Sequence, residues 1–192
     1  MTDAPVWRGI AAPIAAISIT GFATSMCYPL FALSLERMGA SNTAIGVNAA
    51  APAVAMLIGV PLLPAAVSRI GLPRLLIAAA LMIAVPLLLL RLIPDVAAWT
   101  ALRFVLGLGI ASAFFGSELW IVAGAPPARR GLMIGIYGVF LALGFIAGPA
   151  ALQWMPLDSW VPFGAAAGMA LAATIPVLRA WDDAPRGLGG PP

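Results

Sequence analysis

Six long apolar stretches constrain the fold of this chain more than any other feature of its sequence. Crossing the hydrocarbon of a bilayer takes about 20 apolar residues in a helix, because each residue advances the helix by about 1.5 Å. The apolar runs are continuous rather than alternating, which excludes a transmembrane β-barrel, and short segments with charges and turn-forming residues separate them. The predicted spans lie near residues 10–35, 44–67, 75–94, 99–123, 131–153 and 160–181.

The scarcity of charge agrees with this prediction. Charged residues make up 9% of the chain and hydrophobic residues 62%, whereas an ordinary soluble domain carries about 25% charged residues. We therefore predict an all-α integral membrane protein, surrounded by membrane lipid, in which residues 1–181 form one six-span bundle. Residues 182–192 are rich in Gly and Pro and are expected to form a flexible cytoplasmic tail.

Missing residue types exclude several classes of function. The chain has no His and a single cysteine, Cys27, so it forms no intrachain disulfide and holds no Ser-His or Cys-His nucleophile pair. We expect no enzyme activity, no metal and no cofactor. All ten basic residues are Arg, and they form no basic run with interleaved aromatic residues, so we expect no nucleic acid partner.

The distribution of arginine predicts the orientation in the membrane. With the N-terminus inside, seven Arg residues lie in cytoplasmic segments and two in outer loops. Because basic residues concentrate on the cytoplasmic side of membrane proteins, both termini are expected in the cytoplasm, and the protein in a bacterial inner membrane. The inner residues are Arg8, Arg69, Arg74, Arg129, Arg130, Arg179 and Arg186, and the outer ones are Arg37 and Arg91.

The second and fifth spans are similar in sequence. At an offset of 89 residues, Ile45 aligns with Ile134, Gly46 with Gly135, Ala53 with Ala142 and Gly59 with Gly148. A chance match in a sequence rich in alanine and glycine is one explanation. The other is a three-helix unit repeated with inverted topology, an architecture in which substrate sites lie near the interface of the repeats. The predicted fold is therefore six transmembrane helices in two inverted three-helix repeats.

Three short motifs follow one another along the chain. SRIGLPR (68–74) follows the second span, RFVLGLG (103–109) lies in the fourth, and the stretch 126–149 ends in Gly148-Pro149. In this order and on these helices they resemble the N-terminal six-helix half of a major facilitator superfamily transporter. The resemblance implies a complete transporter of two six-helix halves with the transport path between them. This chain stops where the central linker would begin.

The loop after the second span occupies the place of the family signature Gly-x-x-x-Asp-Arg-x-Gly-Arg-Arg. Arg69 and Gly71 match the signature and Arg74 lies in the same loop, so the resemblance assigns these three residues to a cytoplasmic gate. Ser68 stands where the family has Asp, and Pro64 stands where it has the first Gly. Serine supplies no charge, so the charge contacts that the family Asp makes with neighbouring helices are not available to Ser68.

Two charges interrupt the fourth span. A charge at the bilayer centre costs about 2.5–3.5 kcal/mol, so Arg103 and Glu118 are expected to serve a function. About 22 Å of helix separates them, so they cannot pair on one straight helix. The resemblance implies that Arg103 faces the central path, where it would bind an anionic group or relay a proton. In a chain without His, Glu118 is the candidate for proton coupling.

Both charges also have a simpler explanation. Arg103 lies one helical turn after Trp99, from where its side chain reaches the outer interface by snorkelling. Glu118 lies close enough to the cytoplasmic end of its span to pair with Arg129 or Arg130.

Four further polar residues are candidates for contacts along the path. Asn48 and Tyr137 fall at equivalent positions under the offset of 89 residues, while Thr24 and Tyr28 lie in the first span. The simpler explanation for Asn48 and Tyr137 is hydrogen bonding between helices. For Thr24 it is a hydrogen bond to its own backbone or to a neighbouring helix.

Small residues predict where helices approach closely. Gly131, Gly135 and Gly138 fall on one face of the fifth span, and Gly144 and Gly148 fall on a nearly opposite face. Two small faces predict two packing partners. We assign Gly144 and Gly148 to the contact with the second half of the transporter, through the second and fifth spans. Further candidate packing residues are Gly107, Gly109 and Pro149.

The sequence leaves three possibilities open for function. The first is secondary-active, alternating-access transport of a small, unidentified solute by a half-size or truncated transporter. Its partner would be a second copy or a separately encoded six-span half. The second possibility is a scaffold or regulatory subunit that moves nothing, and the third is a truncated product without activity.

Overall fold

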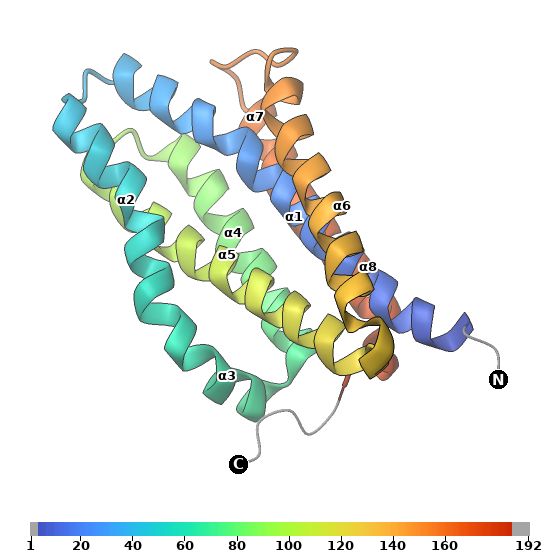
Figure 1. Ribbon diagram of the computed structural model, residues 1–192. Helices are drawn as coiled ribbons and strands as arrows, with labels where there is room; N and C mark the ends of the chain where they lie inside the picture. The colour runs from blue at the N-terminus through green and yellow to red at the C-terminus, as the bar shows by residue number, and fades with distance from the viewer. Residues whose placement is uncertain (1–3, 186–192) are drawn as a thin grey trace.

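Six helical spans form one bundle in the computed structural model, which describes residues 4–185 (Figure 1). All six spans are long and apolar enough to cross a membrane. Every regular element among the described residues is helical, so the prediction of an all-α membrane fold is confirmed. The elements are α1 (Ala4–Arg37), α2 (Asn42–Gly59), η1 (Val60–Leu62), α3 (Leu63–Ile70), α4 (Leu72–Leu92), α5 (Val96–Gly124), η2 (Pro127–Arg129), α6 (Arg130–Leu152), α7 (Val161–Ala172), α8 (Thr174–Arg179) and η3 (Trp181–Asp183).

Two of the six spans are interrupted along their length. The second span changes from α2 to α3 through the short 3-10 turn that holds Pro61, and Pro64 begins the next turn. The sixth span breaks at Ala173, three residues before Pro176. Proline has no backbone N–H and its ring crowds the preceding turn, which bends or ends a helix. These two spans are therefore each built from two helical pieces.

Short connections join the spans. Ser41 and Asp95 cap α2 and α5, since their side chains accept hydrogen bonds from the backbone N–H groups of Ala44 at 3.2 Å and Ala98 at 2.7 Å. The predicted loop at 68–74 is wrong in its length, because α3 runs to Ile70 and α4 starts at Leu72. Gly71 alone makes the turn with φ of +81°, a conformation that side chains with a Cβ rarely adopt.

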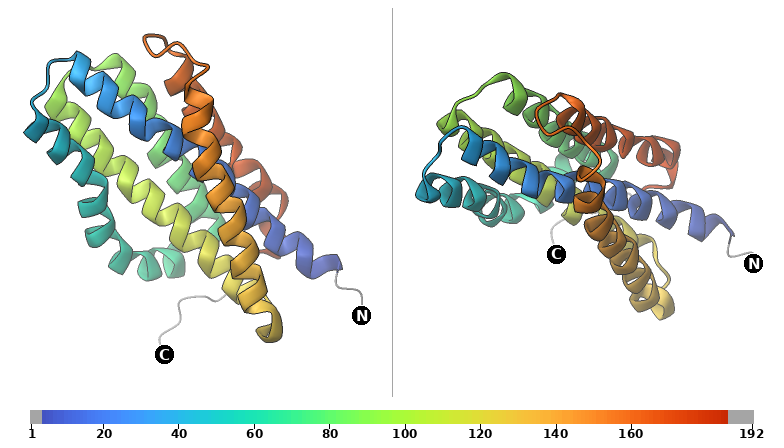
Figure 2. Two further views of the ribbon diagram at one scale, coloured as in Figure 1. Left: turned by 45° about the horizontal axis from the view of Figure 1, so that its top comes forward. Right: turned by 90° about the horizontal axis from the view of Figure 1, so that it is seen from above.

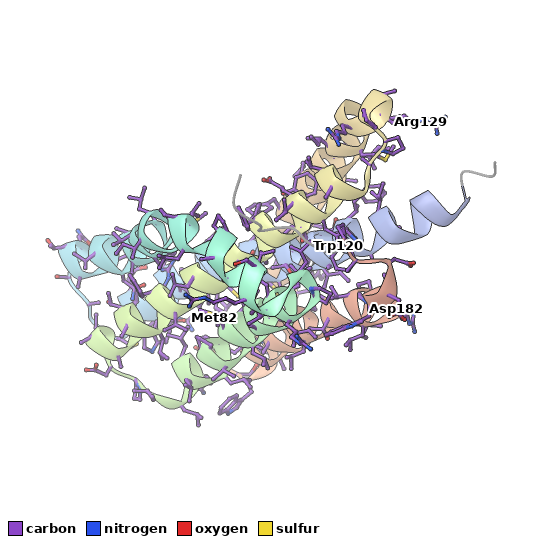
Figure 3. All side chains as sticks on the ribbon, turned by 90° about the horizontal axis from the view of Figure 1, so that it is seen from below. Met82, Trp120, Arg129 and Asp182 are labelled. Atoms are coloured by element: carbon purple, nitrogen blue, oxygen red, sulfur yellow. The ribbon has the colours of Figure 1, made fainter. Side chains whose placement is uncertain are left out.

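Helix α1 lies at the centre of the bundle. From above, α6 lies on one side of α1, and α7 with α8 on the other (Figure 2). In the most apolar part of each span, 72% of the residues are buried in α1 but only 22% in α6 and 33% in the span of α2 and α3. Seen from below, Trp120 lies inside the bundle, whereas Arg129 and Asp182 lie at its edge (Figure 3). The outer faces of α2 and α6 are therefore the least covered.

The helix ends alternate between the two ends of the bundle, as six spans require. Both described ends of the chain, the α3–α4 turn and the α5–α6 connection lie at one end, and the remaining connections lie at the other (Figure 1). Of the arginines that we assign to the cytoplasm, those among the described residues thus share one end, and Arg186 lies outside the described residues. Which membrane side this end faces stays a prediction.

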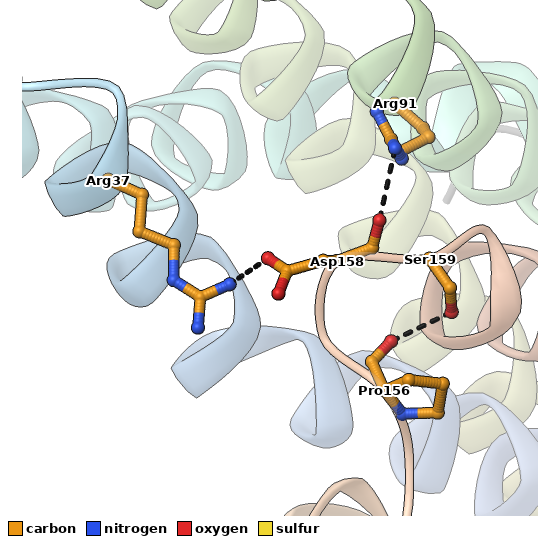
Figure 4. A network of polar contacts seen from close by, with 5 residues as sticks. All are labelled: Arg37, Arg91, Pro156, Asp158 and Ser159. Atoms are coloured by element: carbon orange, nitrogen blue, oxygen red, sulfur yellow. Dashed lines mark hydrogen bonds and ion pairs between the residues drawn. The ribbon is translucent and has the colours of Figure 1, made fainter.

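A polar network holds the loop between α6 and α7 (Figure 4). Arg37 at the end of α1 forms an ion pair with Asp158, and Arg91 at the end of α4 donates a hydrogen bond to the Asp158 carbonyl at 3.1 Å. The Arg91 guanidinium also lies 5.8 Å from the ring centre of Trp160. Both partners of the ion pair are largely exposed, so it contributes only about 0–1 kcal/mol. The network orients the loop more than it stabilises the fold.

The first part of the predicted tail lies against the bundle. Residues 181–183 form the turn η3, and Ala184 is buried. A Cβ atom at Gly9 of α1 would lie 3.5 Å from the Cβ of Asp183. The rest of the predicted tail, residues 186–192, lies outside the described residues.

The glycines of α6 do not pack against the partners that we assigned to them. A Cβ at Gly144 would lie 2.8 Å from the Ser18 carbonyl oxygen of α1, and a Cβ at Gly148 would lie 2.6 Å from that of Phe22. These two residues therefore form the contact with α1 inside the bundle, and assigning them to a second half is wrong. Gly135 is exposed and a Cβ there would meet nothing within 4 Å, so it packs against no described helix.

The other predicted packing residues lie at contacts within the bundle or beside them. A Cβ at Gly107 would lie 2.5 Å from the Cα of Pro52, where α5 crosses α2. One at Gly109 would lie 2.9 Å from the Ala79 carbonyl oxygen of α4. Pro149 is partly buried in the last turn of α6. The α5 glycines thus let α2 and α4 approach its backbone.

Candidate functional site

Four of the predicted polar residues form two pairs, and each pair includes one charge of α5. Arg103 donates a hydrogen bond from Nη1 to Oδ1 of Asn48 on α2 at 2.8 Å. The Tyr137 hydroxyl of α6 donates to Oε1 of Glu118 at 3.1 Å. The pairs lie towards opposite ends of α5, about 22 Å apart along the helix. Helix α5 therefore carries one buried cationic group and one exposed anionic group, each with a neutral partner from another span.

The cationic pair is enclosed by α1, α2 and α5. Arg103 is only 6% exposed, so it lies inside the bundle rather than snorkelling to the interface. Its guanidinium lies 4.7 Å from the ring centre of Phe31 on α1, a distance at which the ring face attracts a cation. Asn48 is itself held by Thr100, whose hydroxyl oxygen accepts from Nδ2 at 3.2 Å. A chain of three polar side chains thus fixes how the guanidinium lies.

The guanidinium of Arg103 is not fully satisfied by the protein. Its Nε is buried and has no hydrogen-bond partner among the described residues. Buried polar groups in folded proteins are nearly always hydrogen-bonded, so Nε of Arg103 can still donate to one further acceptor.

The anionic pair lies at the surface of the bundle. Glu118 is exposed although α5 continues for six residues beyond it, and its partner Tyr137 is buried. Arg130 directs its Nε to the Ala125 carbonyl oxygen at 3.4 Å, and not to Glu118. An exposed carboxylate inside a membrane span is costly against lipid, so this surface is suited to a polar path or to a polar partner.

The two candidates on α1 differ in their surroundings. The Thr24 hydroxyl donates to the carbonyl oxygens of its own helix, at 2.9 Å to Thr20 and 3.3 Å to Gly21. This is the simpler of our two interpretations, and it brings Thr24 into no pair with the charges of α5. Tyr28 is 44% exposed and close enough to Arg103 for an electrostatic interaction.

The three residues assigned to a gate lie together at the end that holds the termini. Arg69 is exposed in the last turn of α3, and Gly71 makes the turn. The Arg74 guanidinium lies 6.0 Å from the ring centre of Trp181, beyond the last span. Ser68, which replaces the signature Asp, donates its hydroxyl to the Ala65 carbonyl oxygen at 2.9 Å. Ser68 therefore bonds its own helix and makes no contact that would hold a gate.

An apolar groove opens between α2 and α5, beside the cationic pair. Its volume is about 760 Å³, and Thr100 is the polar residue in its lining. Such a groove is suited to a lipid tail or an apolar helix face. Its lining includes Val47, Ala51, Val54, Phe104 and Val105.

Sequence reasoning missed the partners of the charges and several buried hydroxyls. It named Asn48 and Tyr137 as path residues but did not pair them with Arg103 and Glu118. It also missed Thr100 and Ser25, whose hydroxyl donates to the Gly144 carbonyl oxygen at 3.3 Å across the contact of α1 and α6. Polarity within a span was the available signal, and it does not tell which neighbouring helix supplies the partner.

Comparisons with known proteins identify the family of the chain. The family model described as Major Facilitator Superfamily matches residues 14–191. YfkF of Bacillus subtilis (strain 168), described as an uncharacterized MFS-type transporter, is 26% identical over 147 residues, which cover 77% of this chain and 38% of that protein.

Two solved structures share the fold. The human organic anion transporter MFSD10 (TETRAN) superimposes with a TM-score of 0.77 at 18% identity, covering 91% of this chain and 47% of that one. The proton:xylose symporter XylE has a TM-score of 0.72 at 16% identity, covering 94% and 44%. The chain thus spans less than half the length of each of these proteins.

Proposed function

This chain belongs to the major facilitator superfamily, an integral membrane transporter family and not an enzyme family, and on that premise we propose that it forms one six-helix half of a secondary-active transporter for a small solute. The half would rock against a second six-span half and open the path between them to each side in turn. A second copy of this chain or a separate chain would supply that half. The location we propose is a bacterial inner membrane with the termini inside.

The observation that carries this proposal is the exposed carboxylate of Glu118 inside the fourth span. Against lipid it would be destabilising, but against a water-filled path it is favourable. The hydrogen bond from Tyr137 keeps the carboxylate at the edge between α5 and α6. The chain has no His, so Glu118 is the side chain best suited to take up and release a proton during transport.

Replacing Glu118 with glutamine should abolish uptake that a proton gradient drives. The amide keeps the size of the side chain and the hydrogen bond from Tyr137, but it carries no proton to exchange. The measurement is uptake into proteoliposomes that hold the complete transporter, with and without a pH gradient. Tyr137→Phe is the control, because it removes the hydrogen bond and leaves the carboxylate. Unchanged gradient dependence in Glu118→Gln would remove Glu118 from the mechanism.

The proposed orientation predicts which positions a reagent reaches from outside the cell. Ser41 and Ser159 lie at the end opposite the termini, and Ser68 lies at the end that holds them. A membrane-impermeant maleimide should label Ser41→Cys and Ser159→Cys in intact cells, and Ser68→Cys only after the membrane is opened. The background needs Cys27→Ala, although Cys27 is only 1% exposed. Labelling of Ser68→Cys in intact cells would show that the orientation is the reverse of the proposed one.

Two equivalent packing contacts support the proposed inverted repeat. Gly144 of α6 approaches Ser18 of α1, and Gly107 of α5 approaches Ala55 of α2. The offset of 89 residues that aligns the second and fifth spans converts one pair into the other. Both pairs lie where a peripheral helix crosses a central one. Equivalent contacts in both units are what a repeated three-helix unit produces.

A second candidate function rests on Ser68. The bond of its hydroxyl to the Ala65 carbonyl oxygen leaves the loop without the signature charge, which suits a membrane scaffold or regulatory subunit that does not change conformation. A neighbouring gene for six further spans would favour the transporter. A neighbouring gene for an unrelated membrane enzyme, together with an unaffected Glu118→Gln variant, would favour the subunit.

A further inference from the structure

A pocket of about 190 Å³ opens where α1 and α4 end, beside the connection between α6 and α7. Its floor is apolar, since the lining residues Leu90, Trp99 and Phe163 are all buried. Its rim holds the exposed side chains of Arg37 and Arg91, which Figure 4 shows from close by. The pocket thus combines an apolar floor with a cationic rim, and it lies at the end of the bundle opposite the described termini.

The ionisable residues that line this pocket have a positive net charge. Arg37 forms an ion pair with the carboxylate of Asp158, whereas Arg91 donates to the backbone carbonyl of Asp158, which is a neutral acceptor. Glu36 and Asp95 lie at the same end of the bundle but do not line the pocket, and the side chain of Asp95 caps α5. Two guanidinium groups and one carboxylate therefore leave a single positive charge at the pocket, that of Arg91.

Both guanidinium groups keep hydrogen-bond donors for a ligand. A guanidinium carries several N–H donors, and towards the described residues Arg37 uses only Nη1 and Arg91 only Nη2. The Arg91 guanidinium also lies over the ring of Trp160, 5.8 Å from its centre, which helps to hold it at the rim. Because both arginines contact Asp158, their guanidinium groups lie on either side of one residue (Figure 4). An anion with several acceptor oxygens can therefore bind both groups at once.

We propose that this pocket binds the phosphate group of a phospholipid from the leaflet at this end of the bundle. A phosphodiester carries a single negative charge, which balances that of the pocket, and its oxygens accept hydrogen bonds from both arginines. Such a site lies apart from the charges of α5 and is independent of the solute that the transporter carries. Its ligand would be a structural lipid and not a substrate.

Two features of the pocket favour a lipid over free inorganic phosphate. The apolar floor offers a favourable contact to the glycerol and acyl atoms of a lipid, whereas a free phosphate ion has no apolar atoms to bury. Arg37 and Arg91 lie in the last turns of α1 and α4, with Trp160 half-exposed beside them. Arginine and tryptophan side chains at the ends of membrane spans lie at the level of the lipid headgroups.

Native mass spectrometry of the purified protein in mild detergent tests the site. Dioleoylphosphatidylglycerol should bind saturably, and the affinity of the tightest-bound lipid is the quantity to compare. Dioleoylglycerol has the same acyl chains without the phosphate, so it should bind at least about tenfold more weakly. Inorganic phosphate at the concentration of the lipid should not displace it.

Two variants in the pocket should change the affinity for phosphatidylglycerol in opposite directions. Arg91→Gln removes the unbalanced charge and should weaken binding by about tenfold. Asp158→Asn removes the competing carboxylate and keeps the carbonyl that Arg91 binds, so it should strengthen binding. Arg74→Gln is the matched control, because Arg74 also lies near a tryptophan ring, 6.0 Å from the ring centre of Trp181, at the other end of the bundle. It should leave the affinity unchanged.

The opposite signs separate phosphate binding from a purely structural role of the loop. If Arg91 and Asp158 only held the loop in place, both variants would weaken lipid binding or neither would change it, and either result would overturn the proposal. Equal binding of dioleoylglycerol would show that the phosphate is not recognised. Displacement by inorganic phosphate would show that the ligand is a soluble anion and not a lipid. Circular dichroism and gel filtration establish that each variant is folded.

Discussion

Replacing Gly148 with leucine is expected to prevent the bundle from folding. A Cβ at this position would lie 2.6 Å from the carbonyl oxygen of Phe22 and 2.8 Å from the backbone nitrogen of Met26, and it would overlap the Ser25 hydroxyl. Backbone atoms of α1 cannot move aside unless α1 and α6 separate. Helix α1 is the most buried span, so separating it from α6 disrupts the contact around which the bundle is built.

The expected loss exceeds that of ordinary core overpacking, which costs about 1–3 kcal/mol, because backbone rather than side chains must shift. Gel filtration with fluorescence detection should show no monodisperse peak for Gly148→Leu and a lower thermal midpoint for Gly148→Ala. Gly138→Leu, on the same helix, is the matched control, because a Cβ there meets nothing within 4 Å. A folded Gly148→Leu with the midpoint of the wild type would contradict this packing.

The number and order of the spans could be predicted from sequence because apolar length is a property of one segment at a time. All six predicted spans lie on the observed helices, with ends that differ by several residues. The breaks at η1 and Ala173 were not predicted, although Pro61 lies within η1 and Pro176 follows Ala173 by three residues. Proline is common in membrane helices, and whether it bends or ends a helix depends on the neighbouring helices that satisfy the freed backbone groups.

The glycines of α6 show where this kind of reasoning ends. The sequence places Gly144 and Gly148 on one face and Gly135 on another, and the angles between them follow from helix geometry alone. Which face meets α1 depends on how the whole helix is rotated in the bundle. The sequence holds no local signal for that rotation. The two faces were therefore identified, but Gly144 and Gly148 were assigned to the wrong partner.

The residues of the candidate site could likewise be predicted from the sequence, but their contacts could not. Arg103, Glu118, Asn48 and Tyr137 could be named because polar groups in apolar spans are conspicuous. Their pairing could not, because it depends on the crossing of α2 over α5 and on the approach of α6 to the end of α5. The buried Nε of Arg103 lacks a partner because of one rotamer and of the hydrogen bond that holds it, and a sequence does not specify either.

The exposed glycines of the two least covered spans lead to the prediction for assembly. Gly46 on α2 and Gly135 on α6 are equivalent under the offset of 89 residues, and a Cβ at either meets nothing within 4 Å. Small residues on an open helix face let another helix approach closely. We propose that these faces, rather than the one at Gly144 and Gly148, meet the second half.

Gly46→Leu and Gly135→Leu should therefore separate the assembly and leave the six-span bundle folded. Native mass spectrometry from mild detergent should find the wild-type chain bound to a second copy or to another six-span chain, and the double variant alone. Gly168→Leu on α7 is the control, because that glycine is also open but lies across α1 from α6. Identical halves with all termini at one end would be parallel, related by an axis along the membrane normal, which is the relation between the halves of a full-length transporter of this family. A wild-type chain that is monomeric and active in nanodiscs would refute the assembly, since Glu118 would then face lipid while transport proceeds.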